Sequence, residues 1–153
     1  MIVCGRIGMS DHNGVVRRIA RAFREKRYHT QVKGNNLPRK LPRGRKREES
    51  IYRPDLLVMK EKDGPIHYIV EVETSQPGKA VVGAAVLADA CVDSDPNQQE
   101  AKPTLLFIFY RPTAKLQLAA KRLTRLEPLR RFEHLNDILF LREDEALDKI
   151  QKL

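Results

Sequence analysis

Residues 53–73 read RPDLLVMKEKDGPIHYIVEVE and contain two apolar runs separated by a turn signature. The runs RPDLLVM (53–59) and IHYIVEVE (66–73) are rich in branched apolar side chains, which favours β-strands. The Asp-Gly-Pro step between them is typical of a turn. The stretch therefore predicts a β-hairpin.

Three carboxylates meet on one face of this hairpin if its turn centres on Asp63. In that register Asp55 lies opposite Glu71, and directly opposed residues point to the same side of an antiparallel ladder. Glu73 shares that side because side chains alternate with a period of two. The two glutamates alternate with valines in a strand that an apolar helix follows at once, so the strand is predicted to be central. Crowded like charges repel each other there, and a divalent cation held by carboxylate oxygens relieves the repulsion. The alternative is a solvated acidic face on a half-exposed hairpin.

The composition fits a single globular domain. The chain has 153 residues, of which 41% are hydrophobic, and this is enough for one core. No segment is long and apolar enough to span a bilayer, and the N-terminus lacks the apolar run of a secretory signal. We therefore expect a cytoplasmic protein without a membrane partner. Cys4 and Cys91 lack zinc-ligand spacing, and Cys91 is expected to be a small buried residue.

The net charge of +9 favours a polyanionic partner. Residues 33–47, KGNNLPRKLPRGRKR, hold seven basic residues and no acid, with prolines and glycines that oppose regular structure. We interpret residues 33–50 as a flexible basic loop that contacts the phosphate backbone of a nucleic acid. The alternative is a merely solvated charged segment. The cations expected to make the contacts are Lys33, Arg39, Lys40, Arg43, Arg45, Lys46 and Arg47.

Hydrophobic periodicity predicts the elements in the order α-β-β-β-α-β-α-β-α. Helices are expected at 10–27, 77–91, 112–126 and 143–152, and strands at 28–33, 53–59, 66–73, 104–110 and 137–141. The run TLLFIFY at 104–110 is apolar throughout, as in a strand buried on both faces. One α/β domain over 1–153 follows from this order, with a mixed central sheet flanked by helices and a C-terminal strand and helix.

The αβββαβ order, with Pro54 and Asp55 opening the second strand and an acid pair closing the third, resembles the PD-(D/E)xK superfamily of restriction-endonuclease-like nucleases. The resemblance covers roughly residues 11–110. It implies a restriction-endonuclease-like fold and an endonuclease that depends on Mg²⁺ or Mn²⁺, with DNA as the expected substrate. It places magnesium ligands at Asp55 and Glu71. Many relatives act as dimers, so a homodimer is a further expectation.

The third residue of the family's triplet is normally lysine, and this chain has Glu73 there. Some restriction endonucleases of the superfamily use an ExE triplet, in which the second glutamate is a metal ligand or general base, and Glu73 fits that variant. Alternatively, Lys79 at the start of the next helix supplies the missing ammonium to the site. The other interpretation of Lys79 is an ordinary surface lysine. Glu25 is matched to a first-helix acid that serves as an extra metal ligand in the family. The alternative is that Glu25 is an exposed partner of neighbouring arginines. Gln76 is expected to contact phosphate or water near the metal, or only to begin the helix.

Two further functions are open from the sequence. A catalytically inactive nucleic-acid-binding module of the same fold would bind with salt sensitivity and would not cleave. A subunit that docks an acidic protein through the basic loop would bind without competition from nucleic acid. Convergence of the three acids within metal-bridging distance separates the nuclease from the inactive module. The histidines are assigned no catalytic role, since His12, His29 and His134 show no ligand spacing and His67 lies far down its strand.

Overall fold

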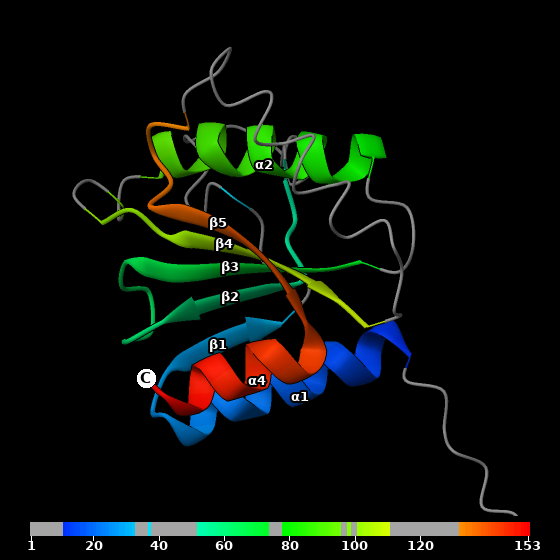
Figure 1. Ribbon diagram of the computed structural model, residues 1–153. Coiled ribbons are helices and arrows are strands. Elements are labelled where there is room, and N and C mark those ends of the chain that lie inside the picture. The colour runs from blue at the N-terminus through cyan, green and yellow to red at the C-terminus, as the bar shows by residue number, and fades with distance from the viewer. Residues whose placement is uncertain are drawn as a thin grey trace, which may run out of the picture.

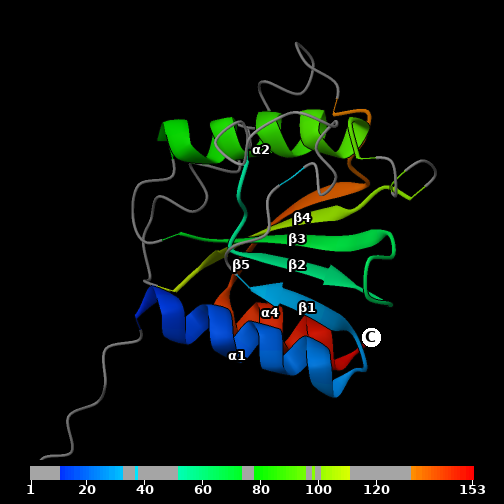
Figure 2. The same ribbon diagram turned by 180° about the vertical axis from the view of Figure 1, so that it is seen from behind.

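The computed structural model describes residues 11–32, 37, 52–73, 78–95, 98, 101–110 and 132–153. Within these ranges the chain forms three layers, a five-stranded sheet with one helix on one face and two on the other (Figures 1 and 2). The strands are β1 (His29–Val32), β2 (Leu56–Met59), β3 (Ile66–Glu73), β4 (Thr104–Phe109) and β5 (Asp137–Arg142). The helices are α1 (His12–Glu25), α2 (Gly78–Asp93) and α4 (Glu143–Gln151). The predicted α/β class and mixed sheet are confirmed.

The strand order is β1-β2-β3-β4-β5, antiparallel from β1 to β3 and parallel from β3 to β5. β3 is therefore central, as predicted. Because β3, β4 and β5 are parallel, their carboxyl ends lie at the same end of the sheet, and this end is the edge meant below. The antiparallel β2 begins at that edge, and so does α1 (Figure 1). Chain segments from four parts of the sequence thus converge there.

The hairpin of β2 and β3 has the register predicted from its turn. Leu56 pairs with Val70, and one further step along this ladder sets Asp55 beside Glu71. Between Val58 and Met59 the register shifts by one residue, so the pairing at this end differs by one residue from the pairing beside the turn. Asp63 in the turn has a φ of 61°, a left-handed conformation that aspartate adopts more readily than most residues. The turn and this register shift together determine which residues meet at the other end of the hairpin.

The alternation of strand side chains divides the core between the two faces of the sheet. The face toward α2 buries, among others, Leu57, Ile69, Ala85, Cys91 and Phe107. The face toward α1 and α4 buries, among others, Ile19, Phe23, Val58, Val70 and Ile150. β4 contributes to both cores because it is buried along its whole length, as its continuous apolar run predicted. Cys91 is buried, as expected.

α1 begins at His12 because Asp11 caps it. The Asp11 side chain accepts a hydrogen bond of 2.5 Å from the Gly14 amide, which satisfies one of the unpaired donors at the helix start. α1 lies beside α4, and the Arg18 guanidinium contacts the Glu143 carboxylate at 2.5 Å (Figure 2). These contacts fix the start of α1 at the edge of the sheet where β3 ends.

Two predicted segments lie largely outside the described residues: the helix at 112–126 and the basic loop at 33–50. Of that loop the structure describes Leu37, which is buried and forms an isolated bridge with Tyr52. Across the described part of the chain, no helix has the length and apolar character needed to cross a membrane.

Candidate active site

Asp55 lies just before β2 and is almost fully buried at the edge where β3 ends. Its Oδ2 accepts a hydrogen bond of 2.9 Å from the Val72 amide of the neighbouring strand. The same oxygen lies 3.1 Å from Nε2 of His12, the first residue of α1. The carboxylate therefore joins the start of β2 both to the central strand and to the first helix.

Glu71 is held by a buried tyrosine. The Tyr52 hydroxyl donates a hydrogen bond of 2.5 Å to Oε1 of Glu71. Burial, followed by the charge of Glu71, raises the pKa of Tyr52 well above its usual value, so the phenol stays protonated and remains a donor. Tyr52 is thus the fixed partner of the central carboxylate in this arrangement.

The electrostatics show that the three acids lie close enough to act on one another. Burial raises the pKa of Glu71 to about 8, the Tyr52 hydrogen bond opposes that rise, and the charge of Asp55 adds to it. Burial, then the charge of Asp55, also raises the pKa of Glu73, and His12 lowers it. Each cause follows from carboxylates that share a poorly hydrated space. Asp55, Glu71 and Glu73 are therefore brought together, as their predicted common face requires.

The donor chemistry of this cluster suits a hard divalent cation, because carboxylate oxygens are its preferred ligands. A cation would also offset the burial cost and the repulsion by Asp55 that together raise the pKa of Glu71 and Glu73. In the side-chain positions observed, the described residues nevertheless contain no group of three or more His, Cys, Asp or Glu side chains arranged to hold a metal ion. Metal binding at this cluster therefore requires the carboxylates to turn, and the Tyr52 hydrogen bond is the contact that Glu71 would have to relax.

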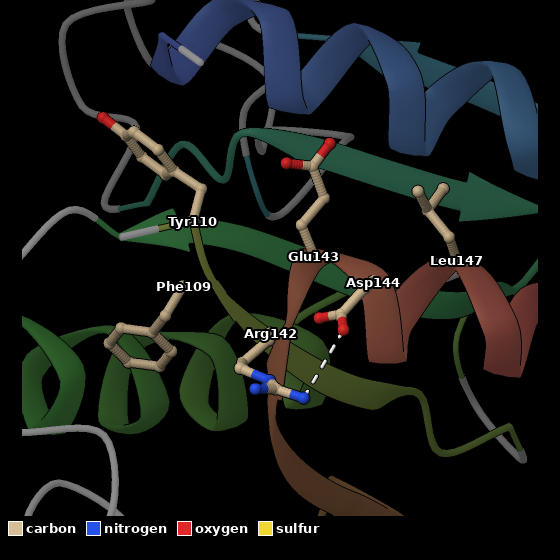
Figure 3. Close-up of a pocket in the computed structure, with 6 residues that line it drawn as sticks. All are labelled: Phe109, Tyr110, Arg142, Glu143, Asp144 and Leu147. Carbon is tan, nitrogen blue, oxygen red and sulfur yellow. Dashed lines mark hydrogen bonds and ion pairs between the residues drawn. The ribbon is translucent and has the colours of Figure 1, made fainter. Parts of the chain in front are cut away.

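A cavity of about 340 Å³ lies at the same edge of the sheet. Figure 3 shows its lining at the ends of β4 and β5 and the start of α4, with Tyr110 and Glu143 directed toward α1 and Arg142 joined to Asp144. The parallel registers set Glu73 beside Phe109 and Phe109 beside Arg142. The cavity is therefore adjacent to the acids along the sheet edge, where open α/β sheets commonly bind ligands.

The structure does not bring Glu25 to the acids. It lies at the opposite end of the 14-residue α1 from His12, roughly 20 Å along the helix axis. Its carboxylate pairs at 3.0 Å with Arg21, one turn earlier, and is exposed. Glu25 is thus the exposed partner of a neighbouring arginine, the alternative to a metal ligand.

The other predicted site residues lie outside what the structure describes. α2 begins at Gly78, so Lys79 falls in its first turn as expected, but its side chain is not among those described. Gln76 lies in the undescribed segment 74–77. The same holds for the seven cations of the basic loop, namely Lys33, Arg39, Lys40, Arg43, Arg45, Lys46 and Arg47. Their roles stay predictions.

Sequence reasoning missed His12 and Tyr52. His12 follows the helix cap directly, and its position at the start of an amphipathic helix was the available signal that it could face the sheet edge. Tyr52 lies three residues before Asp55, and only its burial in the structure indicates that its hydroxyl needs a hydrogen-bond acceptor. Neither signal names a partner, because both contacts join segments far apart in sequence.

The pKa of the Cys91 thiol is raised to about 11 by burial, which keeps the thiol protonated and excludes it as a nucleophile near neutral pH. The chemistry of this edge therefore rests on carboxylates, one imidazole and one phenol.

Comparison of the chain with family models, with curated proteins and with solved structures found no match to any of them.

Proposed function

We propose that this chain is a metal-dependent nuclease of restriction-endonuclease-like fold that hydrolyses phosphodiester bonds in DNA. The observation that carries the proposal is the meeting of Asp55, Glu71 and Glu73 at the end of the central strand, where burial first, and then the neighbouring acids, raise the pKa of Glu71 to about 8. Carboxylates whose pKa is strongly raised by burial and by neighbouring charges are typical of sites that hold cations or move protons. The mixed sheet and the order of its elements agree with the proposed fold.

Asp55 and Glu71 would hold Mg²⁺ or Mn²⁺, with Glu73 as third ligand or base. Such a cation, when bound, polarises phosphoryl oxygens and stabilises the negative charge that develops during hydrolysis. The supporting point is the donor set, which offers three carboxylates and no soft ligand in contact with them among the described residues. Turning Glu71 away from the Tyr52 hydroxyl would free Oε1 for the ion.

Glu73 is the best placed general base in this proposal. It is half-buried, and burial together with the charge of Asp55 raises its pKa, which makes its carboxylate a stronger proton acceptor. It would take the proton of the attacking water. His12 and Tyr52 would orient Asp55 and Glu71, and their rigid positions on α1 and beside β2 keep the acids from drifting apart.

Positive charge would position the nucleic-acid backbone around the acids. The net charge is +9, and Arg17, Arg21 and Arg24 lie exposed along the outer side of α1, the helix that begins at the acid cluster. The basic residues of 33–47 would add further phosphate contacts. A homodimer and a cytoplasmic location stay predictions from the sequence.

Cleavage of labelled duplex, branched and single-stranded DNA with Mg²⁺ or Mn²⁺ tests the proposal. We expect wild-type protein to cut at least one of these substrates only with the metal. Asp55→Asn and Glu73→Gln, which keep size and remove the charge, should each lower the rate by a factor of about 10² or more. Glu61→Gln is the matched control, since Glu61 is an exposed acid at the turn end of the same hairpin.

A second candidate is a catalytically inactive nucleic-acid-binding module of the same fold. Two observations favour it: Glu73 stands where the family's triplet has lysine, and the described side chains form no ready-made group of three metal ligands. It predicts tight, salt-sensitive DNA binding that is unchanged by Asp55→Asn, with no metal-dependent cutting of any substrate. That result would overturn the nuclease proposal and support this one.

A further inference from the structure

We propose that the cavity at the ends of β4 and β5 holds an unstacked nucleobase of the DNA strand whose phosphate faces the acids. This inference deepens the proposed function and rests on it, since it makes DNA with an unpaired nucleotide near the cut the substrate class. The cavity has a volume of about 340 Å³ and lies at the end of the sheet where β3 carries Glu71 and Glu73. That volume is at the lower end of the range of about 300–1,000 Å³ found for ligand pockets.

The cavity combines apolar walls with a polar rim. Figure 3 shows Tyr110 and Leu147, both half-buried, directed to the side of the sheet that α1 covers. The polar side chains of Arg142 and Asp144 are 58% and 73% exposed, so they lie at the solvent side of the lining. An aromatic ring beside an aliphatic side chain suits a planar ligand, and stacking on an aromatic ring accepts any base because every base has a π-face.

The charge of the lining disfavours a phosphate group as the occupant. Among the described residues that line the cavity, Glu143 and Asp144 are acids and Arg142 is the cation. Arg142 already contacts Asp144 at 3.4 Å and Glu145 at 3.5 Å. The acids of the first turn of α4 also offset the positive end of its helix dipole. The uncharged base is therefore the part of a nucleic acid that suits this cavity.

Glu143 gives the cavity a fixed hydrogen-bond acceptor. The Arg18 guanidinium donates to its Oε1 at 2.5 Å and to its Oε2 at 3.3 Å, and the Glu143 side chain is only 20% exposed. An ionised carboxylate has about four acceptor positions, so these two bonds leave capacity for a further donor. The exocyclic amino group of a base is such a donor, and carboxylates accept from it in protein–DNA contacts.

The span between the acids and the cavity fits a single strand of DNA. Glu73 pairs with Phe109, and Phe109 pairs with Arg142, so the lining begins one strand away from the acids. Neighbouring strands lie about 4.8 Å apart and nucleotides rise about 3.4 Å along one DNA strand, which sets the base about one to three nucleotides from the phosphate at the acids. A paired base enters such a pocket only after it is unstacked and unpaired, at an energetic cost. Single-stranded DNA and DNA with an unpaired nucleotide therefore fit better than perfect duplex.

The test compares two single-stranded oligonucleotides of about eight nucleotides, within the usual site size for such strands. One is normal, and the other is its abasic analogue, which has the same phosphates and no bases. Fluorescence anisotropy with a chelator present gives both affinities. Tyr110→Leu removes the aromatic ring and keeps an apolar side chain, whereas Tyr110→Phe keeps the ring. Tyr28→Leu is the matched control, since Tyr28 is a half-buried tyrosine beyond the opposite end of α1, in ring contact with Phe23 and Tyr68.

We expect Tyr110→Leu to bind the normal oligonucleotide about fivefold or more weakly than wild type, the lower limit of what the stacking of one base contributes. Its affinity for the abasic analogue and for perfect duplex should stay within about twofold of wild type, because neither presents a base to the cavity. Tyr110→Phe and Tyr28→Leu should stay within about twofold of wild type on the normal oligonucleotide as well.

Equal losses on the normal and abasic oligonucleotides in Tyr110→Leu would overturn the inference, since no base would then depend on Tyr110. Unchanged binding of both would overturn it too. In either case metal-dependent cleavage by the wild-type protein would leave the proposed function standing. Wild-type protein that binds no oligonucleotide would overturn the inference and the proposed function together.

Discussion

Glu71 makes the metal-free protein sensitive to alkaline pH. Its pKa rises on folding from 4.5 to about 8, chiefly through burial. Between these values the folded protein holds a proton that the unfolded chain has lost, so the free energy of unfolding falls as pH rises and levels off above about 8. Glu71→Gln removes this titration.

We therefore expect wild-type melting temperature, measured with a chelator present, to drop by several degrees between pH 5 and pH 9 relative to Glu71→Gln, since about 1 kcal/mol moves the melting temperature of a domain this size by about 2–4 °C. Glu61→Gln serves as the control for loss of an exposed acid. Parallel pH profiles for wild type and Glu71→Gln would contradict the raised pKa.

Tyr52→Phe isolates the hydrogen bond to Glu71 while keeping the buried ring. The Tyr52 hydroxyl lowers the pKa of Glu71, so its removal should raise that pKa further and extend the loss of stability to higher pH. Above pH 8 the variant should be less stable than wild type by about 1–3 kcal/mol, the usual worth of a hydrogen bond to a charged group. Denaturant unfolding at pH 6 and pH 9 checks this. Equal losses at the two pH values would indicate a packing defect instead.

At the scale of elements, the end of α1 carries strain that a glycine should release. Arg27 has a φ of 66°, and the Tyr28 amide bonds back to the Phe23 carbonyl at 3.1 Å, the pattern of a helix C-terminus that favours glycine. Arg27→Gly should raise the free energy of unfolding by about 0.5–1 kcal/mol, after the larger freedom of glycine in the unfolded chain is allowed for.

Arg17→Gly is the matched control, since Arg17 lies in the interior of α1 and is also exposed. It should lower the free energy of unfolding by about 1 kcal/mol, because glycine disfavours a helix interior. Urea unfolding distinguishes the two signs. A loss of stability in both variants would mean that Arg27 makes contacts worth more than the strain it bears.

The elements could be predicted because their signals are local. The alternation of 66–73 and the turn at Asp63 fixed both the central strand and the register that sets Asp55 beside Glu71. The helix predicted from residue 10 likewise begins close by, at His12, with Asp11 as its cap. Predicted bounds differ from the observed ones by a few residues at the ends, where capping and sheet pairing rather than periodicity decide.

The rest of the site depends on how elements cross, which no local pattern records. His12 meets Asp55 only because α1 packs across the sheet with its first residue at the end of β3. The same geometry removes Glu25 from the site, since a straight helix carries it roughly 20 Å from that end. The face of a helix could be predicted from sequence here, and the position of its two ends relative to the sheet could not.

At the scale of the whole molecule, a chain of net positive charge carries a local cluster of acids. The net charge is +9, while Asp55, Glu71 and Glu73 gather at one edge of the sheet. The two features favour one polyanionic partner only if cations intervene at the acids. Without a divalent ion the cluster repels phosphate locally even as the molecule attracts it overall. The proposed binding and the proposed cleavage of DNA are therefore expected to respond to salt and to divalent ions in different ways.

The salt dependence of DNA binding tests the basic part of this arrangement. Replacing Arg43, Arg45, Lys46 and Arg47 by alanine should reduce the slope of log affinity against log salt by up to about 3.6, since each phosphate contact contributes about 0.9. Lys60→Ala with Lys62→Ala is the control, because these exposed lysines lie at the turn end of the hairpin, away from the acids. Fluorescence anisotropy with chelator present measures both slopes. If the control lowers the slope as much per charge as the fourfold variant does, the positive charge acts as a diffuse field, and residues 33–47 are not the site of backbone contact.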